Sequence, residues 1–225
     1  MRVWVTRAQP QAAATAERLV QRGHEPVVQP LIETRIVPVA LESLAGAGAL
    51  AFTSQTAIDA ALSQGLVPAL ADLPVFAVGD ATAEAAHRAG FKQVHSAAGT
   101  VTDLAALILS IPPSWQGDLV HLSARQPAGD LTGLLEKAGC TARRVTLYET
   151  IDAAKGEVPE AVEAILIHSA KAARRAAAMI SPDAARNMCL FGLSEAALTP
   201  LNAIKFHQRA VAPIANEASI LSLLD

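Results

Sequence analysis

Hydroxyl residues, glycines and a few cations follow the predicted strands of this chain at six places. These places are residues 6–7, 53–54, 79–82, 123–125, 169–171 and 192–195. In a parallel α/β sheet, ligands bind at the carboxyl ends of the strands, where the next helix begins with free N–H groups and a positive dipole end. Such groups suit the binding of carboxylates. The candidate binding residues are Thr6, Arg7, Thr53, Ser54, Gly79, Thr82, Arg125, Ser169, Lys171 and Ser194.

Each of these candidates has a structural alternative. A Ser or Thr that follows a strand caps the next helix more often than it contacts a ligand. Arg7, Arg125 and Lys171 could pair with acidic groups of a ligand, and each could equally be a solvated surface charge. Of the histidines we single out His168, at the end of a predicted strand, and a structural role is the favoured reading there too.

The single tyrosine, Tyr148, lies in a motif that occurs twice. Leu-x-Glu-Thr is found at residues 31–34 and again at 147–150, 116 residues later. The same spacing relates the apolar run 3–5 to 119–121. A repeat this long indicates a duplicated half and not a solenoid. We therefore expect two similar lobes with the function between them. From these residues alone, Tyr148 is expected to be a buried core side chain.

Apolar runs alternate with segments of helical periodicity along the whole chain, which predicts an α/β fold with parallel sheets. Strands are expected at residues 3–6, 25–31, 49–53, 75–78, 94–96, 119–122, around 145, 164–167 and 188–191. Helices are expected at 11–22, 57–62, 102–110, 131–138 and 171–179. Two further helices are expected, one that ends near residue 90 and one that begins at residue 195. We expect an extended connector at 34–39, a loop at 123–129, and a helix end at Pro112, Pro113 and Ser114.

Two assignments of domains fit these elements. In the simpler one, each copy of the repeat folds by itself and the chain divides near residues 112–117. In the other, each Leu-x-Glu-Thr segment crosses between lobes. Residues 1–34 would then join 152–225, and residues 37–147 would form an inserted lobe. The repeat alone does not favour either assignment.

Composition excludes several functional classes. A net charge of −3, with no stripe of basic and aromatic residues, argues against a nucleic-acid partner. No apolar span approaches the roughly 20 residues of a membrane helix, and no secretory signal is evident, so a soluble cytoplasmic protein is expected. Cys140, Cys189 and the histidines lack the spacing of metal ligands and of a disulfide framework, which predicts reduced, buried thiols. Dinucleotide loops, triphosphate loops and the hydrolase Gly-x-Ser-x-Gly elbow are also absent.

Taken in order, the motifs resemble one family over essentially the whole chain. They are Val-Thr-Arg at 5–7, Phe-Thr-Ser at 52–54, Val-Gly-x-x-Thr-Ala at 78–83 and Leu-Tyr-Glu-Thr at 147–150. This series resembles uroporphyrinogen-III synthase. The resemblance implies two flavodoxin-like parallel-sheet lobes joined by a two-stranded linker, with the active cleft between them. It therefore favours lobes 1–34 plus 152–225 and 37–147, with linkers near 34–37 and 147–152.

The resemblance also implies a reaction. The linear tetrapyrrole hydroxymethylbilane loses water, its last pyrrole ring is inverted through a spiro intermediate, and the ring closes as uroporphyrinogen III without a cofactor. The partner is this small polycarboxylate, and a monomer is expected. By position, Tyr148 resembles the family's linker tyrosine and would assist departure of the hydroxyl group as a proton donor. Ser54, Thr82 and Ser169 match its strand-end hydroxyls.

The chain departs from the family at two positions. Glu195 stands where the family usually has Thr, and a carboxylate there would repel a polyanion; Ser194 is the nearest hydroxyl. The arginine that the family often carries after the second copy's first strand is out of register, and Arg125 is its nearest candidate. These departures leave two rivals to the enzyme: a two-lobed binding protein for an anionic small molecule, and a regulatory relative without activity.

Overall fold

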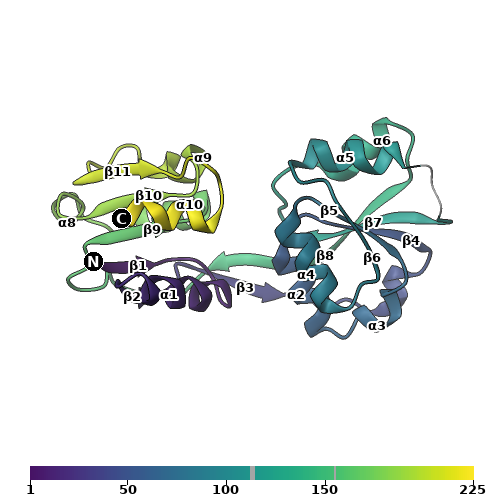
Figure 1. Ribbon diagram of the computed structural model, residues 1–225, viewed down its shortest axis with the longest axis horizontal. Helices are drawn as coiled ribbons and strands as arrows, with labels where there is room; N and C mark the ends of the chain where they lie inside the picture. Colours follow the sequence, from purple (N-terminus) through teal and green to yellow (C-terminus); the bar gives the residue numbers. More distant parts are fainter. Residues whose placement is uncertain (112–114, 155) are drawn as a thin grey trace. The chain divides into compact units, whose positions relative to one another are not determined.

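The computed structural model describes residues 1–111, 115–154 and 156–225, and it divides into two compact units. Unit 1 consists of Met1–Thr34 and Ile151–Asp225, and unit 2 consists of Arg35–Thr150. Each unit is a parallel sheet with helices on both faces (Figure 1). The chain is therefore α/β with predominantly parallel sheets, as the sequence predicted.

The sheet of unit 1 has the strand order β11-β10-β9-β1-β2, and neighbouring strands are parallel. Apart from Arg2, its three central strands contain only apolar residues, because helices cover both of their faces. The strands are β1 (Arg2–Val5), β2 (Glu25–Val28), β9 (Ala164–Ile167), β10 (Cys189–Gly192) and β11 (Gln208–Val211).

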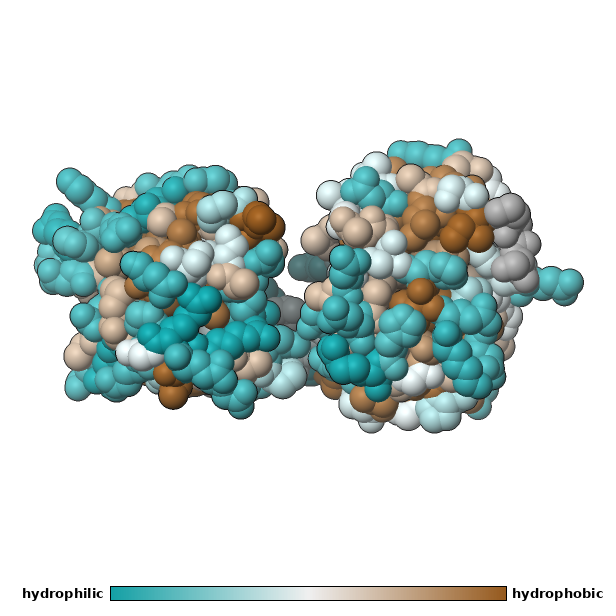
Figure 2. Space-filling model, viewed as in Figure 1, coloured by the Kyte–Doolittle hydropathy of each residue, from teal (hydrophilic) through white to brown (hydrophobic). Residues whose placement is uncertain are grey.

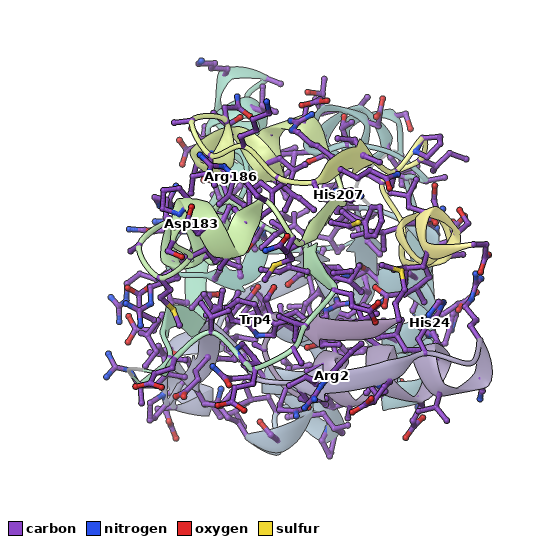
Figure 3. All side chains as sticks on the ribbon, turned by 90° about the vertical axis from the view of Figure 1, so that its left-hand side faces the viewer. Arg2, Trp4, His24, Asp183, Arg186 and His207 are labelled. Atoms are coloured by element: carbon purple, nitrogen blue, oxygen red, sulfur yellow. The ribbon has the colours of Figure 1, made fainter. Side chains whose placement is uncertain are left out.

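Side chains of β1 alternate between the two cores of unit 1, because successive residues of a strand point to opposite faces. Val3 and Val5 pack with one set of helices, and Trp4 packs with the other, where its indole N–H donates to Gln29 O at 2.8 Å. Figure 3 shows Trp4 in the interior of this unit. The first set is α1 (Gln11–Gln21), α10 (Glu217–Leu221) and η3 (Ser222–Leu224). The second is α7 (Ala170–Ala177), α8 (Pro182–Ala185), α9 (Glu195–Leu198) and η2 (Thr199–Leu201).

The second sheet has the strand order β3-β8-β7-β4-β5-β6. Neighbours from β8 to β6 are parallel. β3 runs antiparallel to β8, since Val37 N donates to Leu147 O at 2.8 Å and Ala153 N donates to Leu31 O at 3.1 Å. The strands are β3 (Ile32–Ile36), β4 (Ala47–Phe52), β5 (Pro74–Ala77), β6 (Gln93–Ser96), β7 (Asp118–Ala124) and β8 (Ala142–Asp152).

Helices cover both faces of the β8-to-β6 sheet in unit 2. Figure 1 shows α5 and α6 together on one side and α2 and α3 on the other. Leu50 and Phe52 of β4 pack in one core, and Ala49 and Ala51 pack in the other. The elements are η1 (Leu41–Leu44), α2 (Gln55–Ser63), α3 (Val67–Leu70), α4 (Asp80–Ala89), α5 (Val101–Ser110) and α6 (Leu131–Lys137).

Hydrophilic residues make up most of the visible surface of each unit (Figure 2). Figure 2 shows hydrophobic residues in small groups among hydrophilic ones on the visible face. The strongly exposed large apolar side chains come from different parts of the chain and include Val20, Leu62 and Ile214. No helix among the described residues is long and apolar enough to cross a membrane. The buried apolar side chains form four core clusters.

Several details differ from the sequence-based expectations. The predicted loop at 123–129 is wrong at its start, because β7 continues through Ser123 and Ala124. The predicted connector at 34–39 overlaps a true strand, β3. The elements β11, α3, α8 and α10 were not predicted; β11 begins with two exposed polar residues, and the three helices have four or five residues each. The predicted helix end at Pro112, Pro113 and Ser114 lies outside the described residues.

Candidate functional site

Tyr148 combines a buried ring with a hydroxyl at the carboxyl end of the sheet. It lies in β8, is 8% exposed, and its ring belongs to the core under α2 and α4. Its hydroxyl oxygen is 2.9 Å from Ser54 Oγ. Ser54 is the N-cap of α2, and its Oγ accepts the Ala57 N–H at 3.2 Å. A serine hydroxyl in this place can still donate to the tyrosine. The phenol hydrogen would then face a ligand.

Thr53 brings a histidine into the same region. Its Oγ1 is 3.1 Å from Nε2 of His121, which lies in β7 and is 1% exposed. Burial, followed by the positive charge of Arg144, lowers the pKa of His121 to about 4, although Asp130 acts in the opposite direction. His121 is therefore neutral near pH 7. The sequence offered no sign of this contact, because His121 was expected only as part of a strand.

Gly79 and Thr82 begin the next helix of unit 2. Gly79 is the N-cap of α4 in an extended conformation, and its carbonyl accepts the N–H groups of Thr82 and Ala83 at 3.0 Å. A methyl group built on Gly79 would meet no heavy atom within 4 Å, so the space beside it is open. Thr82 is 6% exposed and lies on the covered side of the helix. Of these two candidates, Gly79 is the more accessible.

Arg125 comes directly after β7 and contacts the segment that holds Tyr148. Its backbone N–H donates to Tyr148 O at 2.8 Å, and its Nε is 2.8 Å from Glu149 Oε2. Arg35 Nε donates to the other carboxylate oxygen of Glu149 at 2.6 Å. The hydrogen bond from Arg35 is the largest influence on the pKa of Glu149 and lowers it; partial burial acts in the opposite direction, and Arg125 lowers the pKa further. Arg35 and Glu149 were not among the predicted binding residues.

In unit 1, Thr6 and Arg7 are engaged by other parts of the protein. Thr6 is fully buried, and its hydroxyl donates to Leu166 O at 2.6 Å. Arg7 Nη1 lies 2.6 Å from Oε2 of Glu217, which opens α10. The same oxygen is 3.1 Å from His168 Nε2. This arrangement uses Thr6 and Arg7 to hold strands and a helix together, and leaves Thr6 no surface for a ligand.

Glu217 is the centre of this buried cluster. Burial alone would raise its pKa, but hydrogen bonds from His168 and Thr15 and the charges of His168 and Arg7 outweigh that effect and lower the pKa to about 2. Thr15 Oγ1 donates to Oε1 at 2.5 Å. Burial is the main cause that lowers the pKa of His168, and its hydrogen bond to Glu217 acts in the opposite direction. Sequence analysis missed Glu217; its one local signal is the capping residue Asn216 before it.

Three strand-end serines share one geometry. Ser54, Ser169 and Ser194 are the N-caps of α2, α7 and α9, and each Oγ accepts a backbone N–H three residues later at 3.2 Å. The capping role that the sequence allowed is therefore confirmed for all three. The hydroxyls of Ser169 and Ser194 each keep one O–H that can donate to a ligand, whereas the hydroxyl of Ser54 lies 2.9 Å from that of Tyr148. Lys171 lies in the first turn of α7.

The unfavourable carboxylate of Glu195 has a partner. Arg209 of β11 forms a two-point ion pair with it, with Nη1 at 3.1 Å from Oε1 and Nη2 bonded to Oε2. The pair lowers the pKa of Glu195 and keeps it ionised. The expected repulsion of a polyanion by Glu195 is thus reduced, because its charge is compensated within unit 1.

The predicted residues therefore gather at the strand ends of each unit. In unit 2, Thr53, Ser54 and Arg125 come together with Tyr148 of β8 where β4 and β7 end. In the described part of the chain, no group of three or more His, Cys, Asp or Glu could hold a metal ion. Both cysteines are free; Cys189 is buried as expected, whereas Cys140 is partly exposed. The arrangement can donate protons and hydrogen bonds to an anionic ligand.

Comparisons with known proteins point in the same direction. The family model described as "Uroporphyrinogen-III synthase HemD" matches residues 13–222. No curated protein matches the sequence. The uroporphyrinogen-III synthetase of Helicobacter pylori 26695 has a similar structure, with a TM-score of 0.71 and 16% identity over 99% of this chain and 97% of that one. A mutant uroporphyrinogen III synthase of the extremely thermophilic bacterium Thermus thermophilus gives a TM-score of 0.58 and 18% identity over 99% and 96%. At these identities the structures establish a shared fold, and the family match over nearly the whole sequence places this chain in the uroporphyrinogen-III synthase family.

Proposed function

We propose that the protein is a uroporphyrinogen-III synthase, a cyclising lyase of tetrapyrrole biosynthesis. It converts hydroxymethylbilane to uroporphyrinogen III with loss of water and inversion of the last pyrrole ring. The family match over residues 13–222 supports the reaction. The observation that carries the chemistry is the hydroxyl of Tyr148, held 2.9 Å from Ser54 at a strand end.

Tyr148 is the proposed proton donor. Loss of the hydroxymethyl oxygen as water requires one proton, and the phenol supplies it while the C–O bond breaks. The electrons of that bond leave with the oxygen, so a cationic carbon conjugated to the first pyrrole remains. Ser54 donates to the phenolate that forms and stabilises it. The α-carbon of the last pyrrole that already carries the bridge to the third ring attacks the cationic carbon, which gives the spiro intermediate. The bond from that α-carbon to the bridge carbon then breaks and leaves a cationic bridge carbon on the third ring. The other α-carbon of the last pyrrole bonds to this bridge carbon, and the proton that it loses returns to Tyr148. Water is the sole by-product, and no atom is oxidised or reduced.

The other strand-end groups are proposed to hold the acetate and propionate side chains of the substrate. Ser169 and Ser194 cap their helices through Oγ and retain an O–H donor. Gly79 offers an open approach to the first turn of α4. Thr53, Thr82, Arg125 and Lys171 complete the proposed set, whereas we assign Thr6 and Arg7 a positioning role because of their internal bonds. Fixing one conformation of a flexible substrate selects the isomer that forms.

We also propose that both units are flavodoxin-like halves of one duplicated ancestor. Along its sheet, unit 1 has the order β2-β1-β9-β10-β11, which is the flavodoxin order 2-1-3-4-5. The strands β8-β7-β4-β5-β6 give the same order when β7 and β8 are the first two strands. The repeat in the sequence relates β1 to β7, which supports this assignment. The segments near 34–37 and 147–152 would then be the two-stranded linker, and the lobes would be 1–34 plus 152–225 and 37–147.

The reaction and the family support three further proposals. Because the conversion involves no net oxidation, we propose that it needs no cofactor. We also propose that the protein works as a monomer in the cytoplasm. Activity measured after exhaustive dialysis against a chelator tests the first of these statements, and size-exclusion chromatography with light scattering tests the oligomeric state.

The deciding experiment supplies the purified protein with freshly generated hydroxymethylbilane. The products are oxidised, and the porphyrin isomers I and III are separated. We expect isomer III from the wild type, and a Tyr148→Phe variant that is slower by roughly 10²- to 10⁴-fold, the usual contribution of a general acid. Ser54→Ala should lose less activity than Tyr148→Phe, because the proton donor Tyr148 is retained. Isomer I at the unaided rate from the wild type would refute the enzyme assignment. A fully active Tyr148→Phe variant would refute only the proposed role of Tyr148 and would leave the enzyme assignment intact.

A further inference from the structure

Two arginines of unit 2 share one carboxylate next to Tyr148. Arg35 donates to Oε1 of Glu149 through Nε at 2.6 Å and also through Nη2, and Arg125 donates to Oε2 through Nε at 2.8 Å. Both carboxylate oxygens are therefore engaged. Two cations and one anion leave the group with a net charge of +1.

Exposure differs sharply within this group. The Glu149 side chain is 15% exposed, whereas those of Arg35 and Arg125 are 63% and 57% exposed. The carboxylate lies beneath, and the guanidinium groups reach solvent. Toward other described residues, both terminal nitrogens of Arg125 and Nη1 of Arg35 form no hydrogen bond or ion pair. Donors oriented by Glu149 are thus presented outward.

A planar guanidinium binds a carboxylate through two parallel hydrogen bonds, and it does so best when its orientation is already fixed. Long side chains on a surface normally lose conformational entropy when they bind. Glu149 removes much of that loss by holding both arginines through Nε. An ordinary surface ion pair, in contrast, joins one cation to one anion and leaves no net charge.

We propose that Arg35 and Arg125 form a clamp for one carboxylate side chain of the substrate and that Glu149 is its positioning residue. This inference rests on the proposed function, because a polycarboxylate is the substrate there. The clamp is connected to the proton donor through the backbone, since Glu149 follows Tyr148 in β8 and the backbone N–H of Arg125 donates to Tyr148 O at 2.8 Å. Its task is to fix the register of the substrate chain relative to Tyr148.

The repeated Leu-x-Glu-Thr motif provides a matched control. Glu33 occupies the position in the first copy that Glu149 occupies in the second, and it is exposed on β3. No hydrogen bond or ion pair joins Glu33 to another residue that the structure describes. Glu33→Gln therefore makes the same chemical change in the same motif without touching the clamp. Arg88→Gln, at a 69% exposed site on α4, controls for the loss of one positive charge in unit 2.

The experiment measures KM and kcat for hydroxymethylbilane and, separately, the Kd of uroporphyrin III, the oxidised product. We expect Arg35→Gln and Arg125→Gln each to raise KM and Kd by about 10-fold or more, the value of one charge-assisted contact. The kcat values should stay near that of the wild type. The KM and Kd of Arg125→Lys should lie between those of the wild type and of Arg125→Gln, because lysine keeps the charge and loses the two-point geometry. The two control variants should match the wild type.

Glu149→Gln separates positioning from simple charge. Replacing the anion raises the charge of the cluster from +1 to +2, so a purely electrostatic effect predicts tighter binding of a polycarboxylate. A positioning role predicts weaker binding, because the arginines repel each other and lose their fixed orientation. Higher KM and Kd with an unchanged melting temperature would support the clamp. Tighter or unchanged binding would refute the role of Glu149, and unchanged KM and Kd in both arginine variants would refute the clamp itself. Failure of the proposed function has a different signature, namely no isomer III from the wild type.

Discussion

Acid should destabilise unit 2 through one buried histidine. His121 lies in the middle of the sheet at 1% exposure, with Nε2 3.1 Å from Thr53 Oγ1. Burial, then the charge of Arg144, lowers its pKa from 6.5 to about 4. In the unfolded chain the same imidazole binds a proton at about pH 6.5. Between these two values the unfolded state is protonated and the folded state is not.

The size of the effect follows from linkage. A shift from 6.5 to about 4 corresponds to about 3 kcal/mol, at about 1.4 kcal/mol per pKa unit. The folded pKa is depressed, so the stabilisation is fully present above about pH 6.5 and is lost as the pH falls toward about 4. Acidification over this range should therefore lower the free energy of unfolding of unit 2 by about 3 kcal/mol from this residue alone.

The two tryptophans make the measurement specific to a unit. Trp115 packs on Phe76 of unit 2 with ring centroids 5.4 Å apart, and Trp4 lies in unit 1. In a Trp4→Phe background, fluorescence during urea unfolding follows unit 2. His121→Gln keeps a hydrogen-bonding group beside Thr53 and does not titrate, so its unfolding free energy should fall less between about pH 7 and pH 4.

The matched control is His87→Gln, an exposed site on α4 that should leave the pH dependence of the wild type unchanged. The reasoning would be refuted if His121→Gln lost as much stability on acidification as the wild type does. That outcome would mean that carboxylates, and not the buried imidazole, govern the response of unit 2.

Three other perturbations test the packing and the buried charges. Glu217→Gln should remove a stabilisation of unit 1 that is present above pH 4.5 and is lost as the pH falls to about 2. The pKa shift of Glu217 corresponds to about 3 kcal/mol, which partial exposure of the side chain reduces to about 1–2 kcal/mol. Urea unfolding followed through Trp4 fluorescence measures this loss. Gly48→Ala should destabilise unit 2 by roughly 1–3 kcal/mol, because the added methyl group would lie 2.3 Å from the backbone oxygen of Gln116, and calorimetry should show a lower Tm. Leu50→Ala removes a fully buried side chain and should cost about 2–5 kcal/mol in denaturant titrations.

The parallel α/β fold was predictable because its central strands are covered on both faces. Runs such as 49–53 and 164–167 are nearly continuous in apolar residues, which is the pattern that a doubly covered sheet requires. Ser54 and Ser169 were equally legible as helix starts, since a hydroxyl before a helical segment favours capping. Local chemistry determined these features, so local sequence revealed them.

Partners distant in sequence could not be predicted in the same way. We predicted Arg7, Arg125 and Lys171 as binding residues by one rule, namely that they are cations that follow strands. In the structure, Arg7 and Arg125 have different surroundings. Arg7 is bound to Glu217, 210 residues later, while Arg125 extends to solvent from Glu149. Nothing near Arg7 in the sequence identifies its partner, because the pairing exists only once α10 packs against α1. Edge strand β11 was missed for a related reason: its exposed Gln208 and Arg209 break the apolar pattern.

Tyr148 shows how a core residue can also be a chemical one. Its ring packs with the core of unit 2, which fixes the side chain, while its oxygen emerges at the strand end beside Ser54. Burial of the ring is therefore no argument against catalysis, since a rigidly held donor loses little entropy when it meets the leaving group. Tyr148→Phe retains the ring and removes the oxygen. If this variant reacts more slowly and its unfolding free energy is unchanged, the hydroxyl is responsible for the lost activity. If activity and unfolding free energy both fall, lost packing is responsible.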